Sequence, residues 1–120
     1  MKLLALTLCA FGLLFAAEEK EGNFTIRFEP TAKLQANVEV PFAVHVTDDL
    51  GKPLQQDDHV QMSIAPENQP TVKTIKAWFV APGEFIAKPV FPLDGQWAVT
   101  VTARRLDRVT RRTITFSVAE

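Results

Sequence analysis

The segment TDDLGKPLQQDDHV, residues 47–60, gathers potential metal-ligating side chains, with four aspartates and one histidine in fourteen positions. Carboxylates that bind calcium usually alternate along the chain as D-x-D-x-D, so that several oxygens converge on one ion. The acids here come as adjacent pairs, Asp48 with Asp49 and Asp57 with Asp58, whose side chains point in different directions. The glycine and the proline between the pairs are residues that turns favour. We therefore expect a turn in this segment and no calcium site.

Copper is the second candidate metal, because imidazole and thioether groups bind it and the sequence contains both. His45, His59 and Met62 are the candidates in residues 18–120. Met62 alternates with Val60 and Ile64, so we expect it to fill the core. A copper-binding metallochaperone that uses these three residues is the alternative function, with copper as its cofactor. The preferred interpretation has no cofactor.

A second group of charged residues is RRLDRVTRR, residues 104–112, which lies between two predicted strands and so forms a hairpin tip. As a functional surface it would contact anionic lipid headgroups, phosphate or an acidic partner protein. As a structural feature it would solvate the hairpin and protect an edge strand from aggregation. We do not expect nucleic acid as a partner, because interleaved aromatic residues are missing. The group contains five arginines: Arg104, Arg105, Arg108, Arg111 and Arg112.

The segment AWFVAPGEF places Trp78 directly before Phe79. Neighbouring side chains on a strand point to opposite faces, so one of the two is exposed unless a second layer covers both. An exposed tryptophan would mark a binding surface.

Motifs of catalysis are absent from the sequence. Neither histidine lies in a nucleophile motif, and G-x-S-x-G and phosphate-binding loops do not occur. Paired carboxylates on a turn also need a pocket before they can act as an acid and a base. We therefore expect a protein that is not an enzyme.

The N-terminus has the pattern of a secretory signal peptide: Lys2, then fifteen uncharged residues, then EEKEG. We expect residues 1–17 to be the signal and residues 18–120 to form one domain that is periplasmic or secreted. An uncleaved membrane anchor is the alternative, although the apolar run is short for a transmembrane helix. Cys9 is the only cysteine and lies within this run, so the processed chain would have neither a disulfide nor a thiolate site.

Beyond the N-terminus, hydrophobic residues recur with a period of two, which predicts strands. Seven such segments, separated by turn signals, predict an all-β immunoglobulin-like sandwich of about seven antiparallel strands. Residues 38–46 are expected to bury every second side chain, from Val38 to Val46, and Trp97 is expected in the core. Pro89 is expected on an edge strand or at a bulge. Acids outnumber bases in the first half of the domain and bases outnumber acids in the second, so the surface should be dipolar.

The segment APGEFIAKPVFPLDGQWAVTVTA, residues 81–103, resembles the P-G-x-[YF]-x-A … G-x-W-x-[VL]-x-V signature of the YtkA-like domain family, which includes the periplasmic part of FixH-like proteins. The turn in VHVTDDLGKPL is similar to the D-x-x-G-x-P-[VL] turn of that family. The residues that fit the signature are Pro82, Gly83, Phe85, Ala87, Gly95, Trp97, Val99 and Val101.

The resemblance implies a small exported immunoglobulin-like module of the kind often found near copper handling, respiratory oxidase assembly or metal efflux. The sequence departs from the family in APENQPTVKT, residues 65–74, where many members carry methionine and histidine. We therefore expect an exported accessory module that binds a protein, a membrane-bound complex or an anionic lipid surface in the cell envelope. Its expected binding residues are Trp78 and the five arginines.

Overall fold

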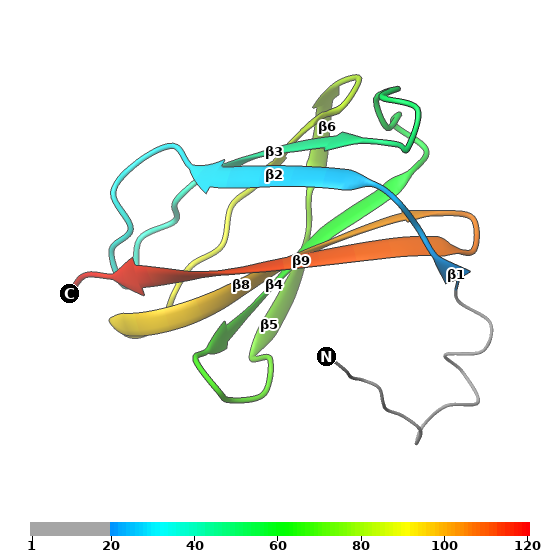
Figure 1. The fold of residues 1–120 in the computed structure, drawn as a ribbon. Coiled ribbons are helices and arrows are strands. Elements are labelled where there is room, and N and C mark those ends of the chain that lie inside the picture. Colours follow the sequence, from blue (N-terminus) through cyan, green and yellow to red (C-terminus); the bar gives the residue numbers. More distant parts are fainter. Residues whose placement is uncertain (1–19) are drawn as a thin grey trace.

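The computed structural model describes residues 20–120, which fold into two packed β-sheets (Figure 1). One sheet has the strand order β1-β9-β8-β4-β5 and the other the order β2-β3-β7-β6. This division of strands between layers is the one that immunoglobulin domains use. The strands are β1 (Lys20–Glu21), β2 (Thr25–Pro30), β3 (Phe42–Thr47), β4 (His59–Pro66), β5 (Lys73–Lys76), β6 (Trp78–Ala81), β7 (Glu84–Ala87), β8 (Gly95–Arg105) and β9 (Arg108–Val118).

The predicted all-β sandwich is confirmed, but the number of strands in the described part of the chain is nine and not seven. The run TVKTIKAWFV, residues 71–80, is rich in residues that favour strands and would make one strand, but it is divided at Ala77 into β5 and β6, which belong to different sheets. In addition, β1 pairs in parallel with β9 at Arg108 and Val109, whereas the other pairings between these nine strands are antiparallel.

The core lies between the two sheets and is built by the alternation that the sequence predicts. Trp97 is only 2% exposed, and its ring meets that of Phe91 edge-on, with 5.4 Å between ring centroids. The indole Nε1 donates a hydrogen bond of 3.0 Å to the carbonyl oxygen of Leu93, which satisfies the one polar atom of the side chain. Val44 and Val46 are buried as expected.

Two expectations about single residues are wrong. Val38 is exposed because β3 begins only at Phe42, so the alternation of the strand does not extend back to it. Pro89 lies beyond the end of β7, which is an internal strand between β3 and β6. Pro89 is buried, and its carbonyl oxygen accepts a hydrogen bond of 3.2 Å from the Val40 backbone.

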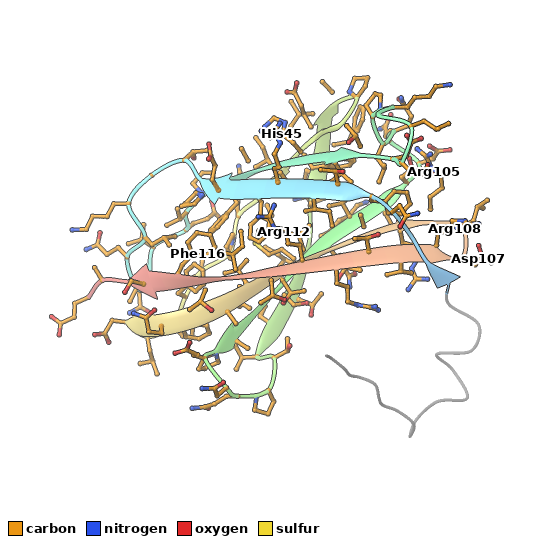
Figure 2. All side chains as sticks on the ribbon, viewed as in Figure 1. His45, Arg105, Asp107, Arg108, Arg112 and Phe116 are labelled. Carbon is orange, nitrogen blue, oxygen red and sulfur yellow. The ribbon has the colours of Figure 1, made fainter. Side chains whose placement is uncertain are left out.

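The two sides of the sandwich differ in how they are closed. On one side β2 faces β9, and Arg112 reaches across the gap to donate a 2.6 Å hydrogen bond to the carbonyl oxygen of Ile26 (Figure 2). Phe28 and Phe116 pack there with 6.1 Å between ring centroids. On the other side, β5 and β6 are the edge strands of their sheets, and the chain crosses between the layers at the buried Ala77. This second side is the more open one.

The expected signal peptide, residues 1–17, lies outside the described residues. Across residues 20–120 no helix is both long enough and apolar enough to cross a membrane.

Candidate functional site

The β8–β9 hairpin confirms the predicted tip but divides its arginines among several environments. Arg105 pairs with Arg108 across the end of the hairpin, so the turn consists of Leu106 and Asp107 alone. Side chains alternate along each strand, so Arg104 and Arg111 point away from the core while Arg105 and Arg112 point toward the layer between the sheets. The five arginines therefore do not form one patch.

Arg105 connects the hairpin to the aspartate-rich loop through two carboxylates. Its Nε and Nη2 donate to the two oxygens of Asp58 at 3.0 and 2.9 Å, and its Nη1 donates to Asp48 at 3.2 Å. The bidentate contact with Asp58 is the strong form of an arginine–carboxylate pair. We call Asp48, Arg105 and Asp58 the ion-pair clamp.

Both aspartates of the clamp also organise their own turns. Asp48 Oδ1 accepts hydrogen bonds from the backbone of Leu50 and of Lys52, each at 2.9 Å. Asp58 Oδ2 accepts from the backbone of Gln55 at 2.7 Å. The hydrogen bond from Lys52 is the main cause that lowers the pKa of Asp48, and the hydrogen bond from Arg105 is the main cause that lowers the pKa of Asp58. The predicted turn is therefore present, with its aspartates serving the backbone and Arg105.

The candidate copper ligands lie on different surfaces. Met62 is 1% exposed and points into the core from β4. His59 is exposed at the start of the same strand, and His45 lies on β3 in the other sheet, on the side facing away from β9 (Figure 2). The structure does not bring these three side chains together. In the part of the chain that the structure describes, no three histidine, cysteine or acidic residues gather closely enough to hold a metal ion.

The open side of the sandwich contains a groove of about 480 Å³ where the chain crosses from β5 to β6. Trp78 is 62% exposed at its border, and Lys76 Nζ lies 5.2 Å from the centre of the indole ring, within cation–π distance. Phe79 points inward and meets Phe85 edge-on, with 5.7 Å between ring centroids. Of the adjacent aromatic pair, the tryptophan is therefore the exposed member. We call this surface the Trp78 groove.

The chemistry of the Trp78 groove is suited to binding. Half of its lining residues are apolar: Val60, Ile75, Ala77, Trp78, Phe79 and Phe85. Asp58 is the one carboxylate among the lining residues, and Arg105 occupies both of its oxygens, so it is poorly placed to act as a base. Polar residues make up the other half of the lining, and a surface that combines apolar contacts with polar groups suits recognition of a partner.

Sequence reasoning missed the ion-pair clamp and the part that Lys76 plays beside Trp78. The partners of Arg105 lie 47 and 57 residues away in the chain, so no local pattern points to them. Lys76 lies two residues before Trp78, and this spacing would have indicated a lysine beside the indole ring if the division of the strand at Ala77 had been known.

Together the strand order and the layered core define an immunoglobulin-like β-sandwich, and comparison with solved structures shows the same fold. A crystal structure of the Lin-41 filamin domain superposes with a TM-score of 0.59 at 15% sequence identity, covering 84% of this chain and 96% of that one. A crystal structure of an engineered protein superposes with a TM-score of 0.61 at 17% identity over 82% of this chain, which spans only 20% of that protein's length. No protein-family profile and no curated protein sequence matches this chain.

Proposed function

We propose that the protein is an exported, non-enzymatic accessory module that binds another protein of the cell envelope through the Trp78 groove. The exposed Trp78 is the observation that carries this proposal. Leaving a large aromatic side chain in water forgoes the stabilisation of its burial, so a tryptophan at the border of an apolar groove suits a surface that a partner covers.

The groove places an exposed tryptophan beside apolar side chains. Tryptophan is enriched among the few residues that contribute most of the binding energy, and such residues lie beside well-packed apolar pockets. Lys76 keeps its ammonium against the indole and so holds a positive charge at the border of the groove. A partner that inserts an apolar side chain and places an acidic one near Lys76 would match both features.

Location in the envelope rests on the apolar run at the N-terminus and on the resemblance of residues 81–103 to the YtkA-like family. That resemblance also supports a respiratory or metal-handling complex as the partner. The copper-chaperone alternative gains no support from the geometry, because its three ligands lie on separate surfaces.

The test is affinity capture of the tagged protein from chemically cross-linked envelopes of its native cells. Trp78→Ser should weaken capture of the specific partner roughly 30-fold, which corresponds to loss of one binding hot spot of about 2 kcal/mol. Leu93→Ser is the matched control, because Leu93 is also large, apolar and exposed but lies outside the groove. Equal recovery of every cross-linked protein with both variants would contradict the proposal.

A further inference from the structure

In the described residues, 20–120, the two sheets end in four edge strands, and these differ in how they are protected against pairing with another chain. Natural sheets protect an edge by keeping the strand very short or by placing charged side chains or proline on it. β1 has only two residues, β2 carries Arg27, Glu29 and Pro30, and β5 begins and ends with lysine. The sequence of β6 is WFVA, which contains neither a charge nor a proline. Its side chains therefore leave β6 the least protected of the four edges.

Both faces of β6 are apolar. Trp78 and Val80 are 62% and 54% exposed on the outer surface, and strand register places Ile86 of β7 beside Trp78. Phe79 alternates with them and points into the Trp78 groove, where its ring meets that of Phe85. The outer face of an antiparallel sheet is normally polar where it meets water. An edge strand with apolar side chains on both faces is suited to being covered on both.

A single extended segment could cover both faces. If it paired with the free edge of β6, it would lie about 4.8 Å from that strand, and its side chains would alternate between the two faces. The side chain opposite Phe79 would enter the Trp78 groove, which opens between β5 and β6. The side chains on either side of it would lie on the outer surface, beside Trp78. An added strand thus fills the groove and covers the exposed tryptophan together.

The geometry of β6 limits the length of such pairing. The register between β6 and β7 shifts between Phe79 and Ala81, which makes Val80 the extra residue of a bulge. A bulge bends a strand and is itself a device that restricts edge pairing. Regular hydrogen bonding is therefore expected at Trp78 and Phe79, so the added segment should be short.

The charges beside the groove favour an acidic segment of another protein. Lys76 Nζ lies 5.2 Å from the centre of the Trp78 ring, and Lys73 begins β5, the other strand at this opening. Asp58 is the one carboxylate among the lining residues, and Arg105 occupies both of its oxygens. A carboxylate from the partner would therefore complement Lys76.

A second copy of this chain fits the edge less well. Symmetric pairing through β6, which has four residues and extends over about 14 Å, would bring two Lys76–Trp78 pairs within that length of each other. The two ammonium groups would repel, and β6 brings no carboxylate to offset them.

We propose that the partner of the Trp78 groove binds as a short extended segment that pairs with the free edge of β6. The segment has apolar side chains opposite Trp78 and Phe79 and an acidic residue near Lys76. This inference rests on the proposed function and specifies the form in which the partner binds. In strand addition, backbone hydrogen bonds contribute affinity, and pockets for alternate side chains contribute specificity.

The test begins with a random peptide library displayed on phage and selected on the purified protein. We expect enriched peptides without proline that carry alternating apolar residues and at least one aspartate or glutamate. Trp78→Ser should weaken their binding roughly 30-fold, the loss of one hot spot. Lys76→Gln should weaken it by up to about fivefold, whereas Lys33→Gln removes the same charge outside the groove and should leave binding unchanged. Melting temperatures confirm that each variant folds.

Backbone pairing is tested by N-methylating an enriched peptide at one residue at a time. In an antiparallel pair, the amides of successive residues point alternately toward the neighbouring strand and away from it. Methylation of the amide that faces β6 removes its hydrogen bond and should weaken binding roughly tenfold. Methylation of the residue directly before or after should change binding by less than about twofold, because those amides face away.

The outcomes separate this inference from the proposed function. Peptides that require Trp78 but tolerate N-methylation at every position would refute strand pairing and leave a groove that binds protein through side chains. Peptides that bind equally well to Trp78→Ser, or a selection without enrichment, would also overturn the inference, while capture from envelopes tests the proposed function independently. A dimer in sedimentation that Val80→Lys abolishes would show that a second copy occupies the edge instead.

Discussion

Truncation of the two tryptophans of the chain should change the unfolding free energy by very different amounts. Trp97 is 2% exposed, packs edge-on against Phe91 and donates its Nε1 hydrogen to Leu93. Trp97→Ala removes this ring from a closed core, which costs about 3–5 kcal/mol of unfolding free energy. For a domain of this size, a loss of about 1 kcal/mol lowers the melting temperature by about 4–8 °C, so the expected fall is at least roughly 12 °C.

Trp78 is the internal control for this prediction. It is 62% exposed, so Trp78→Ala should change the unfolding free energy by no more than about 0.5 kcal/mol. Trp97→Phe keeps an aromatic ring and gives up the hydrogen bond to Leu93, so it should fall between the two. Urea unfolding followed by far-ultraviolet circular dichroism measures all three, and an unchanged m-value shows that the unfolded states are comparable. Equal costs for Trp97→Ala and Trp78→Ala would refute the assignment of core and surface.

Three further predictions follow from the loop, the tip and the histidines. Because the pKa of Asp58 is lowered in the folded state, its carboxylate contributes its full stabilisation above the unfolded pKa of about 3.9, and this stabilisation is lost as pH falls through the folded pKa. The difference in unfolding free energy between wild type and Asp58→Asn should therefore shrink below about pH 4. A constant difference from neutral pH to about pH 2.5 would contradict this. Leu106→Gly relieves a left-handed φ at the tip and should raise stability by up to about 1 kcal/mol, whereas a lower melting temperature would show that the turn is not strained. In titrations with Cu(I) and Cu(II) against a competing chelator, His45→Ala and His59→Ala should each bind as much copper as the wild type, because the two histidines lie in different sheets. Loss of micromolar binding in either variant would show that they form one site.

The fold was predictable because its strands bury every second residue. Val44, Val46 and Trp97 were placed in the core from alternation alone, and the structure agrees. Alternation does not mark where a strand begins, which is why Val38 was misplaced. It also fails where the chain changes sheets at Ala77, since neither glycine nor proline marks that crossing.

The candidate site was less accessible from the sequence because its geometry depends on contacts between distant residues. Five arginines in nine positions were expected to form one tip. Arg105 instead pairs with acids more than forty residues away, and Arg112 bonds to the backbone of Ile26, 86 residues away. Lys76 of β5 and Arg111 of β9 are aligned across the sheet by the register of the strands between them, which no local sequence pattern fixes.

The most direct test of the central claim is site-specific photo-cross-linking at Trp78 in the native cell envelope. A photoreactive phenylalanine derivative would replace Trp78 in one strain and Leu93 in another, and adducts would be identified by mass spectrometry. The proposed function predicts a discrete protein adduct from position 78 that position 93 does not give. Adducts to lipid alone, or the same proteins from both positions, would show that the Trp78 groove is not the docking site of a protein partner.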